Sequence, residues 1–216
     1  MNEDKLMPKV FGWMFLGLMC TFLTGYFISQ YEYTMIKLLT GFTPILLALI
    51  EIGLVVFLST RIYKMSPTTA KVTFLAYSTI SGVTFGGLFI AYDLSSIMSV
   101  FGITAFIFGL FAFIGYITKI DLNKIGTYLI IGLIGSLICS IVNVFLQNTM
   151  FDMIISIVFI LVFVGMTAYD VQKIKNMNSS GMIPADNVAI YGALTLYIDF
   201  INLFIELLKI FGKRDD

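Results

Sequence analysis

Four polar side chains interrupt an otherwise apolar stretch near the end of this chain, "LTLYIDFINLFIELLKIFG": Asp199, Asn202, Glu206 and Lys209. At about 100° per helical residue, all four fall within about 80° of arc on one face of a helix. Carboxylate and amide oxygens gathered on one helix face can exchange protons or hold a hard cation such as Ca²⁺. The opposite face is left to lipid or to packed helices.

Three more charged residues lie in or beside apolar runs. Glu51 stands in the middle of "LLALIEIGLVVF", Asp170 closes the run "VGMTAYD", and Arg61 follows Glu51 by ten residues. These groups have two interpretations. They could pair within a helix bundle and only fix the register of the helices, or they could line a pathway for protons or cations, which is the usual role of acids at membrane depth.

The chain has no histidine, which excludes His-dependent catalytic triads and the usual zinc and haem ligation. Cys20 and Cys139 both lie inside apolar runs, and we interpret them as buried free thiols rather than a disulfide. The remaining chemistry is that of carboxylates, hydroxyls and backbone oxygens, so no resident cofactor is expected. Ca²⁺ would enter as a bound or transported ion.

An aspartate pair could replace histidine as a proton sensor. If Asp170 and Asp199 approach each other, both cannot ionise cheaply in a low dielectric, so they would share a proton and titrate as a coupled pair. A nearby Arg61 would favour the charged forms. To bring Asp170 to the depth of Asp199, the helix that carries Asp170 must continue past Lys175, or the last helix must begin later or tilt.

The composition requires a membrane. Of 216 residues, 59% are hydrophobic and 12% charged, and the mean hydropathy is +0.97. A soluble fold of this length could not bury so much apolar surface. The 13 Lys and Arg balance the 13 Asp and Glu, which argues against a nucleic-acid partner. The lipid bilayer is therefore the first expected partner.

Hydropathy predicts an all-α, polytopic membrane protein with one seven-helix transmembrane domain over residues 1–216. About 20 apolar residues span a bilayer. By that measure, the spans lie near residues 10–28, 42–58, 72–92, 97–117, 127–146, 153–170 and 188–211. The breaks between them hold turn residues, and the longest is "VQKIKNMNSSGMIPADN". The last, polar-striped helix is expected to lie inside the bundle, since it needs partners for its acids.

The distribution of Lys and Arg predicts the orientation. One side collects nine of them: Lys5, Lys9, Arg61, Lys64, Lys71, Lys119, Lys124, Lys173 and Lys175. The other side has four: Lys37, Lys209, Lys213 and Arg214. The positive-inside rule then places the N-terminus in the cytoplasm. Either the last segment crosses against its own local charge, or it dips into the membrane and returns.

Three stretches resemble the bacterial branch of the Bax inhibitor family, the transmembrane Bax inhibitor motif proteins. They are "TAYDVQKIK" at Thr167–Lys175, "YGALTLYIDFINLFIELLKIFG" at Tyr191–Gly212 and, more weakly, "LIEIG" around Glu51. The resemblance implies a seven-helix fold with a central last helix and a pH-sensitive Ca²⁺ leak. The tail "GKRDD" is less basic than in some eukaryotic members, so no role of a basic tail is carried over.

The resemblance also implies roles for single residues. Asp170 and Asp199 would be the paired aspartates that sense protons and bind or gate the cation. Glu51 would match the acidic residue of the second span, and Arg61 the arginine that latches the pair in the closed state. Asn202 and Glu206 are expected to support the pair. A plasma membrane location fits the short loops and the uncleaved N-terminus.

Two other functions are open. Intramembrane aspartyl proteases use one aspartate on each of two helices, the first in a "YD" pair such as Tyr169–Asp170. Their second aspartate lies in a Gly-x-Gly-Asp turn, whereas this chain has "LYID", so we expect no enzyme. The stronger alternative is an integral membrane interaction protein that regulates a membrane protease or a stress response, in which the polar face only fixes helix packing.

Overall fold

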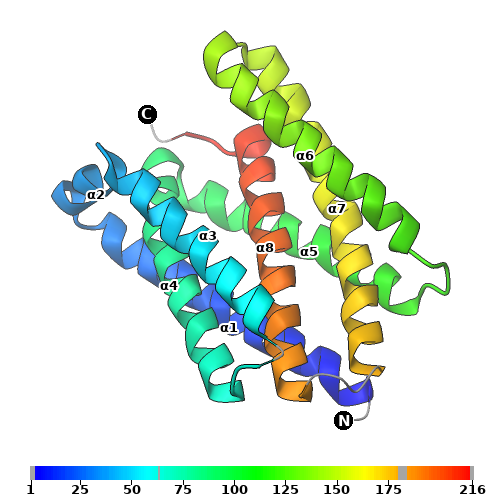
Figure 1. Cartoon of the computed structure of the whole chain (residues 1–216). Helices are drawn as coiled ribbons and strands as arrows, with labels where there is room; N and C mark the ends of the chain where they lie inside the picture. Colours follow the sequence, from blue (N-terminus) through cyan, green and yellow to red (C-terminus); the bar gives the residue numbers. More distant parts are fainter. Residues whose placement is uncertain (1–2, 63, 180–183, 215–216) are drawn as a thin grey trace. The chain divides into compact units, whose positions relative to one another are not determined.

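A computed structural model describes residues 3–62, 64–179 and 184–214, and helices account for nearly all of this part of the chain (Figure 1). The helices are α1 (Glu3–Ser29), α2 (Glu32–Leu39), α3 (Thr43–Arg61), α4 (Pro67–Ala91), α5 (Leu94–Ile117), α6 (Asn123–Leu146), α7 (Thr149–Ser179) and α8 (Ala185–Phe211). Within the described residues, the extended structure amounts to an isolated bridge between Tyr92 and Arg214. The predicted all-α fold is confirmed.

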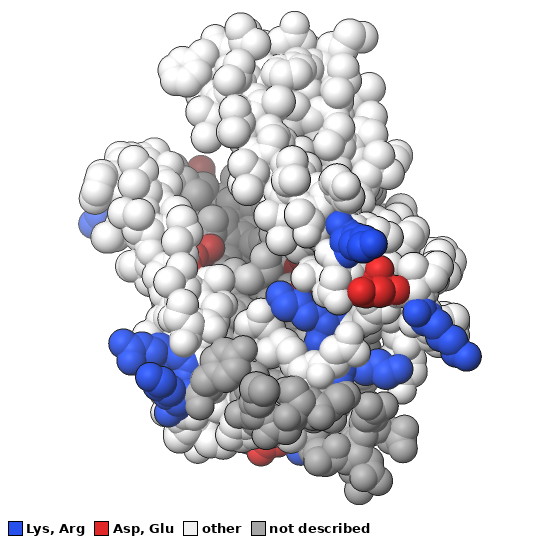
Figure 2. All heavy atoms as spheres, turned by 45° about the vertical axis from the view of Figure 1, so that its right-hand side comes forward, with Lys and Arg blue, Asp and Glu red and all other residues white. Residues whose placement is uncertain are grey.

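Seven helices, all except α2, are long and apolar enough to cross a bilayer. They coincide with the seven predicted spans, which confirms a polytopic membrane protein. Large apolar side chains stand on their surfaces, with Phe106 of α5 74% exposed and Phe145 of α6 84% exposed. On the face drawn in Figure 2, most visible atoms of the described residues likewise belong to uncharged side chains. Such a surface is solvated by lipid chains rather than by water.

The short helix α2 was not predicted. Glu32 in its first turn and Lys37 in its last turn both complement the helix dipole, which favours a helix despite the short length. Met35 is its buried residue and contacts the backbone of α4 where Gly86 has no side chain. The segment therefore folds back on α4, a tertiary contact that hydropathy does not report.

The break predicted after Asp170 is wrong in its first part, because α7 continues to Ser179. Val171 and Ile174 are buried on one side of this extension, while Lys173 and Lys175 are only partly buried. The basic residues therefore belong to an amphipathic end of the helix and not to a loop. Residues 180–183 of the predicted break, and Asp215 and Asp216 of the tail, lie outside the described residues.

Helix α8 begins at Ala185, three residues earlier than predicted. Pro184 immediately precedes it, and Asp186 lies in its first turn. Proline is compatible with a helix start, and an acid in the first turn faces the positive end of the dipole. The early start gives α8 27 residues.

The described residues form two compact units. The first contains α1 to α4, the end of α7 from Ile174 and α8 up to Tyr197. Its core is the packing of α1 on α4. Gly82 permits the closest approach there, since a Cβ at this position would lie 2.8 Å from the backbone oxygen of Thr21.

The second unit contains α5, α6, α7 up to Lys173 and α8 from Ile198. Here α5 and α7 approach so closely that a Cβ on Gly115 would overlap the backbone of Ala168. Since α7 and α8 contribute residues to both units, the single domain expected from the sequence stays a prediction. Cys20 of the first unit and Cys139 of the second carry free thiols, as predicted, but both are half-buried rather than buried.

Candidate site at the buried aspartate pair

Small residues of α5 and α6 hold α7 in place around Asp170. Ala168 lies against Gly115 of α5, and the ring of Tyr169 covers Gly126 of α6, where a Cβ would come within 2.5 Å of the ring. Any larger residue at either glycine would push α7 away. The two residues before Asp170 are thus fixed by backbone contact with two neighbouring helices.

Gln172 fixes the same turn of α7 from the other end. Its amide nitrogen donates a hydrogen bond to the backbone oxygen of Ile120 at 2.8 Å, and its amide oxygen accepts one from the backbone nitrogen of Leu122 at 2.9 Å. Both partners belong to the connection between α5 and α6. Asp170 therefore sits on a helical turn that is held on both sides, which leaves its side chain little freedom to move away.

Aromatic packing orients the second half of α8. The ring of Phe200 meets those of Phe101 and Phe108 of α5 edge to face, at centroid distances of 5.2 Å and 5.4 Å. Phe204 packs on Phe101 at 6.1 Å. Since Phe200 is the next residue after Asp199, this packing sets the rotation of α8 and with it the direction of the aspartate.

Asp170 and Asp199 meet. Their side chains are hydrogen-bonded to each other and are only 4% and 3% exposed. A hydrogen bond between two carboxyl groups needs a proton on one of them, because two ionised carboxylates have only acceptors. Such a pair can share one proton, and the second oxygen of Asp199 is buried without a hydrogen-bond partner.

The extension of α7 explains how the two aspartates reach one depth. Asp170 lies nine residues before the end of α7 at Ser179, about 14 Å along the helix axis. It is thus inside a helix and not at its end. Of the arrangements that the sequence left open, the continuation of α7 past Lys175 is the one observed. Lys173, within one turn, interacts electrostatically with Asp170.

The polar face of α8 continues to Glu206, which is 8% exposed. One Glu206 oxygen accepts a hydrogen bond from Lys209 Nζ at 2.8 Å, and the other is buried without a partner. Lys209 thus forms an ion pair within α8, while its side chain stays 41% exposed. Asn202 is half-buried and donates its amide hydrogen to the backbone oxygen of Ile198 at 2.8 Å.

Glu51 and Arg61, both on α3, belong to the first unit, whereas the aspartate pair belongs to the second. Glu51 is half-buried and accepts a hydrogen bond from the hydroxyl of Thr84 on α4 at 2.6 Å. Arg61 ends α3, and its side chain is exposed. The latch between Arg61 and the aspartates stays a prediction.

Sequence reasoning missed a hydroxyl cluster in the first unit. Tyr197 of α8 is completely buried, and its hydroxyl lies 2.6 Å from that of Thr21 on α1, which also bonds the backbone oxygen of Ser78 on α4 at 2.9 Å. Ser81 of α4 bonds the side chains of both Tyr197 and Tyr77. The spacing of Tyr77 and Ser81, four residues apart on one helix, was the available signal.

These features define a multi-spanning α-helical membrane protein with a buried carboxyl pair between its last two helices. The family "Inhibitor of apoptosis-promoting Bax1" matches residues 3–216, so the chain belongs to the Bax inhibitor-1 family.

Relatives support the assignment over nearly the whole chain. The "Inner membrane protein YbhL" of Escherichia coli (strain K12) is 38% identical over 213 residues, which cover 96% of this chain and 91% of the relative. An "Uncharacterized protein" of Borreliella burgdorferi is 38% identical over 218 residues, covering 98% and 93%. One of Deinococcus radiodurans is 33% identical over 211 residues, covering 97% and 90%.

Proposed function

We propose that this protein is a pH-sensitive Ca²⁺ leak of the bacterial inner membrane, gated by the Asp170–Asp199 pair. The observation that carries the proposal is the hydrogen bond between two carboxyl groups that are both more than nine-tenths buried. A buried acid pair is costly, and acids at membrane depth usually serve the passage of ions or protons. The name of the Escherichia coli relative supports the inner membrane as the location.

The proposed gate is a competition for the same oxygens. Ca²⁺ prefers carboxylate and carbonyl oxygens and takes about six to eight of them. Two carboxylates provide some of these ligands, and backbone oxygens or water must provide the rest. A Ca²⁺ ion that enters displaces the shared proton, whereas protonation removes the charge that attracts the ion. Lys173, and Arg61 if the latch exists, would compete with the ion electrostatically.

Weak, shared coordination suits a leak better than a storage site. Conduction requires that an ion bind well enough to enter and weakly enough to leave. The pair is held by packing at Gly115 and Gly126 and by Gln172, so its oxygens stay in place while their occupant changes between a proton and a cation. The buried free oxygen of Asp199 offers a first contact for the ion.

The test is Ca²⁺ flux into liposomes that contain the pure protein and a Ca²⁺-sensitive dye, measured from acidic to alkaline pH. We expect flux above that of empty vesicles and a clear change with pH, which Asp199→Asn abolishes. Asp152→Asn is the matched control, because Asp152 lies exposed in the first turn of α7, the helix of Asp170. Flux equal to that of empty vesicles at every pH would refute the leak.

A negative result would favour the second candidate, an interaction protein that regulates a membrane protease or a stress response. In that case the acid pair would only fix the packing of α7 against α8. Whether the pair itself is proteolytic is tested by incubating the purified protein with a model transmembrane peptide and measuring cleavage. We expect no cleavage, and the names of the relatives denote no enzyme.

A further inference from the structure

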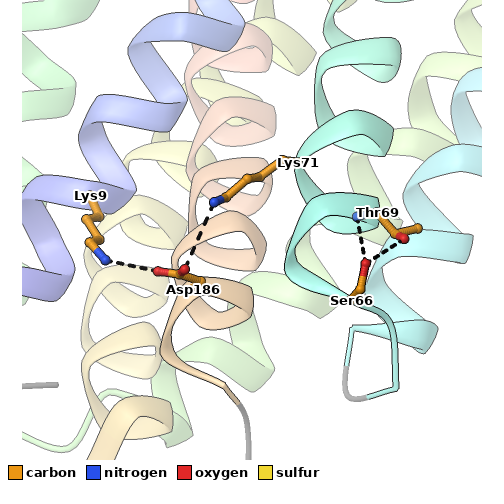
Figure 3. Close-up of polar contacts among 5 residues, drawn as sticks. All are labelled: Lys9, Ser66, Thr69, Lys71 and Asp186. Carbon is orange, nitrogen blue, oxygen red and sulfur yellow. Dashed lines mark hydrogen bonds and ion pairs between the residues drawn. The ribbon is translucent and has the colours of Figure 1, made fainter.

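The start of α8 brings together two lysines from different helices. Lys9 Nζ of α1 lies 2.9 Å from one oxygen of Asp186, and Lys71 Nζ of α4 lies 4.0 Å from the other (Figure 3). The side chains are 46%, 35% and 43% exposed for Lys9, Lys71 and Asp186. One carboxylate therefore holds two ammonium groups close together where solvent or lipid headgroups can reach them.

The carboxylate is itself held in place by its neighbour in the sequence. Asn187 is completely buried and donates two hydrogen bonds, to the backbone oxygens of Ile62 at 2.8 Å and Met65 at 2.9 Å. Both acceptors lie at the connection of α3 to α4. The first turn of α8 is thus anchored, so Asp186 presents the two lysines in a fixed arrangement rather than as two independent surface chains.

The cluster has an excess of one positive charge, since two ammonium groups face one carboxylate. At 4.0 Å, Lys71 Nζ is too far from Asp186 for a hydrogen bond. It donates none to any other described residue and lies 5.6 Å from the centre of the Trp13 ring. Its N–H groups can therefore bind a further oxyanion. Tryptophan is typical of the membrane interface, the level of lipid headgroups.

We propose that Lys9 and Lys71 bind the phosphate of an anionic phospholipid at this end of α1, α4 and α8. A phosphodiester carries one negative charge, which neutralises the excess of the cluster. Basic groups between transmembrane helices are a general way to hold such headgroups. The lipid tails would lie along the apolar outer surface of the helices. This site is independent of the proposed Ca²⁺ leak, because it uses other residues, in the first unit.

The test is native mass spectrometry of the delipidated, full-length protein with added phosphatidylglycerol or phosphatidylcholine of the same acyl chains. We expect preferential retention of phosphatidylglycerol, reduced about 5-fold by Lys71→Gln and by Lys9→Gln, since one basic group near a headgroup has about that effect. Lys71→Arg should retain the lipid. Lys64→Gln is the matched control, an exposed lysine of the α3–α4 connection.

Two results would overturn the proposal. One is equal retention of the two lipids. The other is the same loss for Lys64→Gln as for Lys71→Gln, in proteins whose elution volume and helicity match the wild type. A parallel arm adds inorganic phosphate at the same concentration as the lipid. Displacement of phosphatidylglycerol by equimolar phosphate would show a site for free phosphate and would also refute a lipid site.

Discussion

Two spans of this protein carry an acid near their middle, and the structure surrounds these acids in different ways. In the most apolar 18 residues of α3, only 6% of the residues are buried, and Glu51 is half-buried with one hydroxyl partner. In the most apolar 18 residues of α8, 67% of the residues are buried, and Asp199 is hydrogen-bonded to a second carboxyl group. An acid in an apolar sequence is therefore not a site by itself. The neighbouring side chains decide whether the acid has an ordinary hydrogen-bond partner, as Glu51 has, or is paired with a second carboxyl group, as Asp199 is.

The largest expected effect concerns the pair as a unit. Asp170→Asn and Asp199→Asn should each abolish the pH response of Ca²⁺ flux, and the double variant should be no worse than either. Residues that act together lose their function with the first substitution, so their effects do not add. The measurement is a double-mutant cycle of Ca²⁺ flux in liposomes, with the wild type, the two single variants and the double variant. Additive losses would show that the aspartates act separately.

The packing that holds the pair is tested at Gly115. Gly115→Val should destabilise the protein by about 1–3 kcal/mol, because the new side chain overlaps the α7 backbone at Ala168. Gly102→Val is the matched control on the same helix, with no atom within 4 Å of its Cβ, and should change stability by less than about 0.5 kcal/mol. Thermal unfolding in detergent measures both. Equal shifts would mean that the close α5–α7 contact is not needed.

A smaller effect is expected at the end of α3. Arg61→Ala should raise the resting Ca²⁺ leak at neutral pH by up to about 5-fold, if the latch exists, because an exposed ion pair contributes at most about 1 kcal/mol. Arg61→Lys is the control and should restore most of the closure. An unchanged resting leak would refute the proposed latch and would leave the proposed role of the aspartate pair untouched.

The smallest effect is expected at Glu51. Glu51→Gln keeps an oxygen that accepts from Thr84, so the pH response should persist and flux should change less than about 3-fold, within the worth of one hydrogen bond. The same flux assay measures it. Loss of the pH response here would erase the contrast between the two spans and would place Glu51 in the gate.

The sequence predicted the seven spans and singled out both aspartates as candidate site residues, because lipid imposes long apolar runs and makes each buried charge conspicuous. It did not show that α7 continues to Ser179. Lys173 and Lys175 follow an apolar run, and basic residues in that position are typical of a loop as well as of an amphipathic helix end. Nor did it show α2, whose one buried residue depends on the surface of α4.

The sequence allowed the contact between Asp170 and Asp199 to be proposed, but the spacing of the two residues could not establish it. It rests on contacts such as Gly115 with Ala168, which bring distant parts of the chain together. The hydroxyl cluster of Thr21, Ser81 and Tyr197 escaped notice for the same reason. Hydroxyl groups are common in membrane helices, so the four-residue spacing of Tyr77 and Ser81 is a weak signal until their partners are known.

The central claim is that a proton and a metal ion exchange at one pair of carboxyl groups. The most direct measurement is the number of protons released when Ca²⁺ is added to the purified protein in weakly buffered detergent solution. We predict the release of about one proton per bound Ca²⁺ from the wild type, and none from Asp199→Asn. Ca²⁺ binding without proton release, or equal release from the variant, would contradict this account.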